Sequence, residues 1–192
     1  IELTETFIEP EKAFPFPWTF FKFFQAMPES VYLKPVPLKP IDSSILKSKY
    51  DLIILPYQVW FLSPSLPISS FLQSEEAKQL FADTPVVTVI GCRGMWLTAQ
   101  EKMKTLLEKL NAKLIDNVAL IDECGAGFSF LATPLWMLTG KKQSVSWIPK
   151  AGVSDIDINQ SVRFGLAIEN RLTRDNSDLN TSMLKGLDAV KI

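Results

Sequence analysis

Two loops of this 192-residue chain carry side chains that could bind a planar, apolar ligand. Residues 56–61 read PYQVWF, and residues 91–96 read GCRGMW. Aromatic rings can stack on a ligand ring and shield it from water. Glycines let the backbone approach a ligand closely. The two segments therefore suit a ring system held between aromatic side chains and backbone.

Each loop follows a short run of apolar residues, 52–55 for the first and 86–90 for the second, and a helical pattern follows each loop. This order is typical of two consecutive strand–loop–helix units of a parallel sheet. In open α/β sheets, ligands bind at the edge where the parallel strands end. We therefore expect the two loops to lie together at the carboxyl edge of one sheet.

The chain contains no histidine, and its two cysteines are Cys92 and Cys124. These residues cannot supply a Ser–His–Asp triad, a Cys–His pair or a histidine-based metal site. We therefore expect no metal site, and acid–base chemistry would come from Asp, Glu, Lys, Tyr or a cofactor. The sequence singles out no catalytic residue. Two cysteines make no disulfide framework, which favours a cytoplasmic protein.

The composition is that of a globular protein, with 47% hydrophobic and 21% charged residues. The net charge of −1 supplies no general attraction for nucleic acid. The longest apolar stretch, 125–140, is shorter than the roughly 20 residues that a membrane-spanning helix needs, and Pro134 interrupts it. We expect no transmembrane segment.

The hydrophobic pattern predicts the following elements: strands at 1–8, 52–55, 86–90 and 114–122; a short helix from Trp18 and another over 42–49; a helical region over 66–81 interrupted near Ser74; a helix from Thr98 to residue 113; a final helix over 155–172; and a short helix within 182–192. Thr98 and Glu101 have the spacing of a capping box. In the final helix, Ile158, Val162 and Leu166 lie on one face, which we expect to pack on the sheet.

These elements predict an α/β domain over residues 1–172 and a C-terminal extension over 173–192. One strand–helix unit is absent from the pattern, because a doubly wound sheet of order 2-1-3-4-5 needs an interior first strand. The chain also begins with Ile1 in the middle of a pattern. We therefore expect a truncated sequence that lacks roughly 30 residues, one βαβ unit, at its N-terminus.

The segments 14–18 (FPFPW), 57–78, 89–96 with 99–102, 136–142 (WMLTGKK) and 151–155 (AGVSD), taken in this order, resemble the dialkylresorcinol condensing enzyme family. The loops at 56–67 and 91–96 also resemble the flavin loops of FMN-dependent NAD(P)H:quinone oxidoreductases of the flavodoxin-like superfamily. The resemblance implies a three-layer αβα sandwich with a parallel sheet. It also implies a flavoprotein of lipid biosynthesis with FMN as cofactor.

The family name implies a role in making dialkylresorcinols. Carbon–carbon condensation of acyl thioesters normally needs a cysteine nucleophile and a histidine, which these residues do not supply. We therefore expect an oxidoreductase, an aromatase that converts a hydrophobic cyclic dione to a resorcinol, while a ketosynthase partner performs the condensation. The alternative functions are a non-catalytic electron carrier and a scaffold that binds a lipid-synthesis ketosynthase. A near-neutral charge argues against the carrier.

The resemblance implies cofactor contacts from both loops. The residues concerned are Pro56, Tyr57, Gln58, Val59, Trp60, Phe61, Gly91, Cys92, Arg93, Gly94 and Trp96. The residues that would hold the FMN phosphate belong to the absent unit.

Each of these residues also has a purely structural interpretation. Tyr57, Trp60 and Phe61 form a wall against the ligand or belong to the core, and the two glycines approach a ligand or make a turn. Arg93 polarises the flavin or forms a salt bridge, and Trp96 caps the pocket or packs under the helix. For Cys92 and Cys124 we favour buried, inert thiols over catalytic thiolates.

Residues 14–24 and 128–138 are rich in aromatic and apolar side chains, and Lys141 and Lys142 follow the second segment. They could line a channel for an apolar substrate, rest on a membrane as a peripheral contact, or complete the core. By analogy with quinone reductases, a homodimer is a further expectation.

Overall fold

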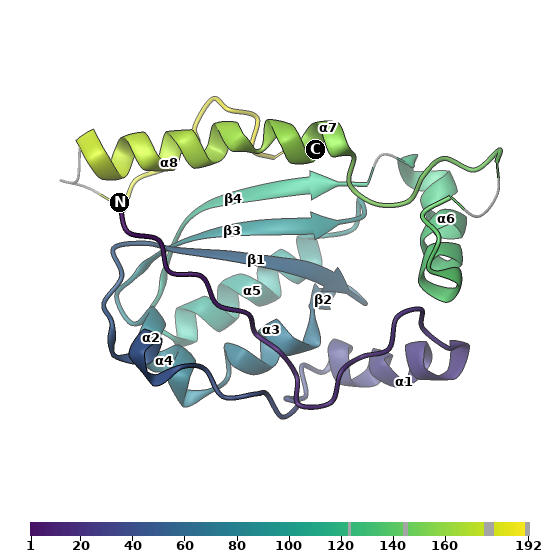
Figure 1. The fold of residues 1–192 in the computed structure, drawn as a ribbon, viewed down its shortest axis with the longest axis horizontal. Helices are drawn as coiled ribbons and strands as arrows, with labels where there is room; N and C mark the ends of the chain where they lie inside the picture. The colour runs from purple at the N-terminus through teal and green to yellow at the C-terminus, as the bar shows by residue number, and fades with distance from the viewer. Residues whose placement is uncertain (123, 144–145, 175–178, 191–192) are drawn as a thin grey trace.

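The computed structural model describes residues 1–122, 124–143, 146–174 and 179–190. It is an α/β fold with helices on both faces of a four-stranded sheet, as Figure 1 shows. The elements in chain order are α1 (Phe20–Val31), α2 (Ser43–Lys47), β1 (Ile53–Trp60), β2 (Ser63–Pro64), α3 (Leu66–Phe71), α4 (Glu75–Phe81), β3 (Pro85–Cys92), α5 (Leu97–Lys109), β4 (Lys113–Ile121), α6 (Gly125–Thr139), α7 (Asp155–Gln160) and α8 (Val162–Arg174). The α/β class predicted from the sequence is confirmed.

The sheet has the order β2-β1-β3-β4. β1 and β3 are parallel, as are β3 and β4, whereas the short β2 is antiparallel to β1. Each of the two parallel pairs is connected through helices, as parallel pairing requires. The three long strands therefore all end at the same edge of the sheet.

Two apolar clusters hold the layers together. On one face of the sheet, Phe71, Phe81 and Met103 of the helices α3, α4 and α5 pack against residues of β1 and β3 such as Leu55 and Ile90. On the other face, a second cluster joins the sheet to α8 and the C-terminal segment; its buried members are Val87, Val118, Phe164, Ile168 and Leu184. β3 is buried on both faces, as the continuous apolar run at 86–90 predicts.

Most of the predicted elements are present, with small shifts in their ends. The interruption near Ser74 is confirmed: its side chain accepts a hydrogen bond from Ala77 N and caps α4. The predicted capping box is wrong. α5 begins at Leu97, so Thr98 lies inside the helix, and Glu101 forms an ion pair with Lys104.

The predicted strand over residues 1–8 is wrong. This segment has no strand, and the side chains of Ile1, Leu3 and Phe7 are exposed. The first backbone pairing along the chain joins Pro10 to Leu38 as an isolated bridge. The alternation of apolar residues is not sufficient for a strand, because a strand also needs a neighbour for its backbone hydrogen bonds.

The predicted inward face of the final helix is also wrong. The helix divides at Ser161 into α7 and α8, and Ile158, Val162 and Leu166 are 47%, 61% and 53% exposed. Phe164 and Ile168 face the sheet instead. The helix carries two apolar stripes, and the one with the large aromatic ring is the one that packs on the sheet.

The C-terminal segment forms no helix in its described part, contrary to the prediction for 182–192. The carboxylate of Asp116 accepts hydrogen bonds from the backbone N–H groups of Met183 and Leu184, which fixes the segment against β4. Val190 then forms a parallel bridge with Ala119. Residues 191 and 192 lie outside the described part.

Among the described residues, no helix has both the length and the apolar character required to cross a membrane.

Candidate functional site

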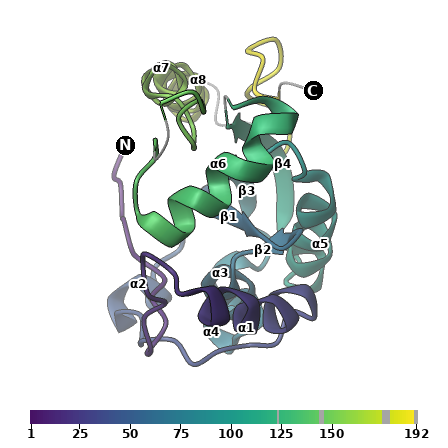
Figure 2. The same cartoon turned by 90° about the vertical axis from the view of Figure 1, so that its right-hand side faces the viewer.

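The carboxyl edge of the sheet brings the two predicted loops together. Gln58 of β1 lies beside Gly91 of β3, and Cys92 lies beside Ile121 of β4. Figure 2 views the molecule from this side, with α6 crossing in front of the strand ends and α1 lying beside it. The predicted neighbourhood of the two loops is therefore confirmed.

The first predicted loop is mostly strand. β1 continues to Trp60, so Pro56, Tyr57, Gln58 and Val59 lie within it. Their side chains alternate across the sheet: Tyr57 is buried, whereas Pro56 and Gln58 are exposed. Val59 is half-buried and packs against the larger core cluster. Only Phe61 of this segment lies beyond the strand.

A tight hairpin connects β1 to β2. Its two central residues, Phe61 and Leu62, both have positive φ angles, of 49° and 58°. Residues with a side chain rarely adopt this left-handed conformation, which costs roughly 1–2 kcal/mol per residue. The turn reverses the chain sharply, since Ser63 pairs with Trp60. Strained backbone of this kind is often found at functional sites.

Tyr57 belongs to a buried polar chain rather than to the surface of the edge. Its hydroxyl donates to Gln100 Oε1 over 2.6 Å. Gln100 Nε2 lies 3.4 Å from Thr88 Oγ1, which in turn donates to Asn117 Oδ1 over 2.9 Å. The polar chain thus links β1, α5, β3 and β4. Burial raises the pKa of Tyr57 well above its usual value, and the nearby Cys92 adds a smaller effect in the same direction.

Trp60 lies in an aromatic cluster that was not predicted from the sequence. Its ring packs edge-on against Phe14 and Trp18, with centroids 5.1 and 5.6 Å away. Phe61 packs against Phe23 of α1 at 4.9 Å. Met137 of α6 packs against the same cluster. The two aromatic segments at 14–24 and 128–138 therefore meet the first loop, and their aromatic composition was the only signal for this.

The second loop is more open. Gly91 lies at the end of β3 and is half-buried, and Gly94 is exposed. A Cβ atom added at either glycine would meet no atom of the chain within 4 Å. Neither glycine is required by packing or by a positive φ, so there is room for a ligand beside both. Trp96 is buried in the core and precedes α5, in agreement with its structural interpretation.

Electrostatics at this edge centre on Asp122, which directly follows β4. Its carboxylate accepts hydrogen bonds from Cys124 N over 2.8 Å and Gly152 N over 3.0 Å. It also interacts with Arg93, whose pKa is lowered by burial and is held up in part by Asp122 and Cys124. Sequence analysis missed Asp122; an acidic residue at the end of a buried strand was the available signal.

Both cysteines are buried. Burial is the main cause that raises the pKa of Cys92 to about 12, and the negative charge of Asp122 is the second cause. The thiol therefore stays protonated at neutral pH, and no histidine is present to activate it. The Cys124 thiol points at the carbonyl oxygens of Pro149 and Lys150. The environments of both residues are those of unreactive thiols.

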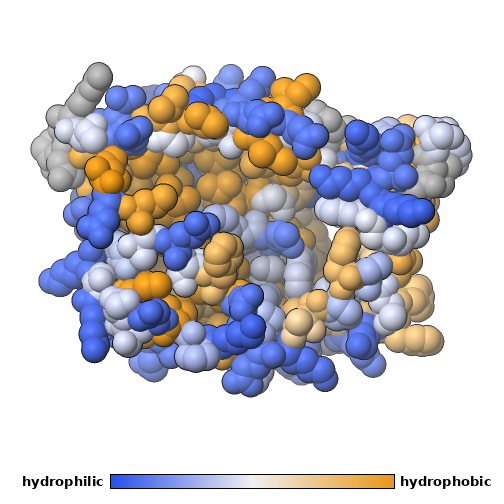
Figure 3. Space-filling model, in the orientation of Figure 1, coloured by the Kyte–Doolittle hydropathy of each residue, from blue (hydrophilic) through white to orange (hydrophobic). Residues whose placement is uncertain are grey.

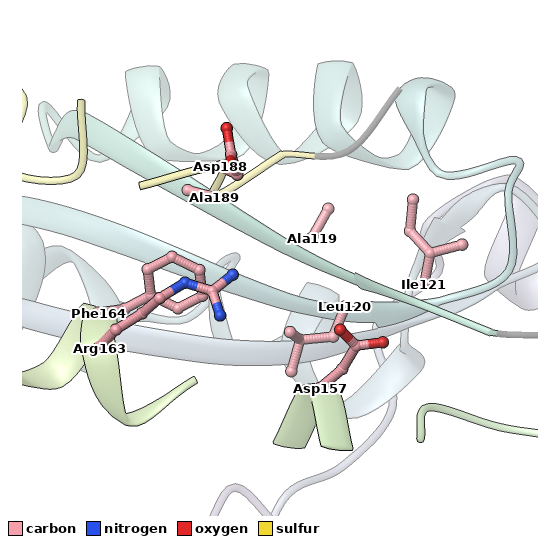
Figure 4. Close-up of a pocket in the computed structure, with 8 residues that line it drawn as sticks. All are labelled: Ala119, Leu120, Ile121, Asp157, Arg163, Phe164, Asp188 and Ala189. Atoms are coloured by element: carbon pink, nitrogen blue, oxygen red, sulfur yellow. The ribbon is translucent and has the colours of Figure 1, made fainter. Parts of the chain in front are cut away.

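Two cavities among the described residues are lined by none of the predicted cofactor-contacting residues. One, of about 30 Å³, lies between β4, the α7–α8 region and the C-terminal segment, and Figure 4 shows Asp157, Arg163 and Asp188 among its lining residues. It has room for roughly one water molecule. The other, of about 290 Å³, lies between residues 8–14, Lys39 and Pro67. Within the described residues, no three or more His, Cys, Asp or Glu side chains are grouped so that they could hold a metal ion.

Comparison of the chain with family models, with curated proteins and with solved structures gives no match.

Proposed function

We propose that this chain is part of an FMN-dependent oxidoreductase that aromatises a hydrophobic cyclic dione to a resorcinol in dialkylresorcinol biosynthesis. The observation that carries the proposal is the open loop at Gly91 and Gly94 beside the strained hairpin at Phe61 and Leu62. Both lie at the carboxyl edge of the parallel sheet, where α/β folds bind cofactors. The resemblance of the two loops to flavin loops supplies the choice of FMN.

The flavodoxin-like arrangement is part of the same proposal. The edge of β1 opposite β3 is paired with β2 only at Val59 and Trp60. On the face that points toward α8, Ile54 is 44% exposed, and Figure 3 shows apolar surface between α8 and the N-terminal segment. A further strand and helix on this side of β1 would cover that surface and complete a three-layer sandwich. The phosphate of FMN would then be held by that unit.

The residues of the two loops would accommodate one edge and one side of the flavin ring. Gly91 and Gly94 leave room for a ring against the backbone, and Arg93 supplies a positive charge beside them. Trp60 and Phe61, held by Phe14, Trp18 and Phe23, would exclude water from one side. FMN, when bound, would accept the hydride released when the dione loses one hydride and one proton to become aromatic.

The test is FMN binding by the full-length natural protein, measured by the quenching of flavin fluorescence. Gly94→Ala places a methyl group in the proposed ring site and should weaken binding about tenfold or more. Gly186→Ala is the matched control, because its added Cβ also meets no atom of the chain, although its positive φ adds strain. No FMN binding by a correctly folded wild-type protein would overturn the proposal.

A second candidate is a flavin-free scaffold for a lipid-synthesis ketosynthase. The observation that favours it is the packing of Trp60, whose ring already has Phe14 and Trp18 as neighbours without any ligand. This candidate predicts no FMN binding together with co-purification of a ketosynthase. In either case we propose a cytoplasmic protein, and in the first case a hydrophobic substrate and a homodimer.

A further inference from the structure

We infer that the surface formed by α1 and the end of α6 docks the protein on an anionic membrane. This inference is separate from the proposed function, because it requires neither a flavin nor a reaction. It rests on three features of the described residues: an apolar stripe on α1 that faces solvent, the contact of the segment before α1 with α6, and the lysines that flank the two helices in the sequence.

Only part of the apolar surface of α1 is buried against the rest of the protein. Ala26 and Ser30 are buried and Phe23 is half-buried, so they define the inward face of the helix. An adjacent stripe of large side chains faces solvent, with exposed fractions of 59% for Phe20, 78% for Phe21, 49% for Phe24 and 43% for Met27. Lys22, Gln25 and Glu29 occupy the third side of the helix. Such an arrangement is typical of a helix that lies in a membrane interface.

The apolar surface continues onto α6. Trp18 N, just before α1, donates to Met137 O over 2.8 Å, and the Phe16 ring lies 6.1 Å from that of Trp136. α6 adds the exposed side chains of Leu131 and Leu138. Figure 2 shows both helices on the side that faces the viewer. The two helices thus lie on one side of the molecule, and both carry exposed apolar side chains.

The charge of the chain segments that contain α1 and α6 favours one kind of partner. Residues 12–34 and 124–150 together contain six lysines and one glutamate, a net charge of +5, although the whole chain has −1. Lys141 and Lys142 directly follow Gly140, which ends α6 next to Pro17. Positive charge beside exposed aromatic rings is the combination that binds anionic lipid headgroups. A second copy of this chain would place like charges against one another, so a membrane fits better.

The experiment is sedimentation of the full-length natural protein with vesicles of phosphatidylcholine alone and of phosphatidylcholine with phosphatidylglycerol. We expect binding to the anionic vesicles, weakened by added salt. The double variant Phe21→Ser/Phe24→Ser should lower the partition coefficient about tenfold or more. Lys141→Gln/Lys142→Gln should lower it by about fivefold for each lysine.

The matched control is Val162→Ser/Leu166→Ser, which removes exposed apolar side chains from α8, outside these basic segments. This variant should bind the vesicles like the wild type. Circular dichroism confirms that each variant is folded. The inference is overturned if the folded wild type does not sediment with anionic vesicles, or if the α8 variant loses as much binding as the α1 variant. It is also overturned if the α1 stripe instead supports a dimer in vesicle-free solution that the Phe21/Phe24 variant dissociates.

Discussion

The Tyr57 hydroxyl, at the centre of β1, donates a hydrogen bond to Gln100 Oε1 of α5 over 2.6 Å, inside the core. This bond begins the polar chain that continues through Thr88 to Asn117. A buried polar chain is stabilising only while each member has a partner. The strand that leads to the candidate site is therefore fixed to the helix that follows the second loop.

Removal of this hydroxyl should destabilise the fold. Tyr57→Phe leaves the Gln100 side-chain oxygen buried without its donor, which costs about 1–3 kcal/mol of unfolding free energy. The check is urea denaturation at neutral pH. Tyr32→Phe is the control, because Tyr32 is 74% exposed, and it should change stability by less than about 0.5 kcal/mol. Equal effects of the two substitutions would contradict a structural role for the polar chain.

Cys92 should resist alkylation. Its pKa is raised to about 12, mainly by burial, so the reactive thiolate is scarce at pH 8. In a Cys124→Ser background, iodoacetamide should modify Cys92 far more slowly in the native protein than in urea. Alkylation at the rate of an unfolded cysteine would contradict the buried thiol.

The same shift predicts a pH dependence of stability. The folded pKa lies above the ordinary 9.0, so the folded state holds its proton more tightly than the unfolded state does. The contribution of Cys92 is therefore complete below pH 9 and is lost as the pH rises toward 12. Between pH 9 and 11, Cys92→Ala should lose stability less steeply than the wild type, as measured by urea denaturation. If the stability of the variant and of the wild type fell equally with pH, the raised pKa of Cys92 would be contradicted.

Asp122 should hold the segment around Gly152 at the carboxyl edge. Asp122→Asn replaces one of two accepting oxygens by an N–H donor, which leaves either Cys124 N or Gly152 N without its bond. We expect a loss of about 1–3 kcal/mol and faster hydrogen exchange at Gly152. Asp51→Asn, at an exposed position, is the control. Unchanged exchange at Gly152 in Asp122→Asn would show that the carboxylate does not position this segment.

The two kinds of glycine should respond differently to alanine. Gly94→Ala should leave the thermal midpoint nearly unchanged, because its added Cβ meets nothing. Gly140→Ala should lower stability by about 1 kcal/mol or more, because φ is +74° and the new atom lies 3.3 Å from Pro17 Cγ. Thermal unfolding measures both. A large loss of stability in Gly94→Ala would mean that a structural contact, not a ligand, requires this glycine.

Local sequence patterns predicted the elements with strong local signals. The β-branched run that includes Val86 and Val87 predicted β3, and the interruption near Ser74 is the point at which α4 begins, because burial and helix breaks are encoded within a few residues. Parallel strands joined by helices then implied that the Gly91 loop lies beside the end of β1. That relationship is the part of the site that sequence could predict.

Features that depend on distant partners could not be predicted. The alternation at residues 1–8 found no neighbouring strand, and α8 carries two apolar stripes of which Phe164 and Ile168 make the packed one. Likewise, the contacts of Trp60 with Phe14 and Trp18 join segments about 40 residues apart, and no local pattern encodes them. The predicted strand ended at residue 55, but proline is tolerated on an edge of a sheet, and β1 continues through Pro56 to Trp60.

The most direct test of the proposed function is the visible absorption spectrum of the full-length natural protein, loaded with FMN and mixed anaerobically with a dialkyl-substituted cyclohexane-1,3-dione. The proposal predicts that the absorption band of oxidised flavin bleaches while one equivalent of the resorcinol forms per flavin. An oxidised flavin band that persists in the presence of the dione would contradict the aromatase. A folded protein that takes up no FMN at all would favour the flavin-free scaffold.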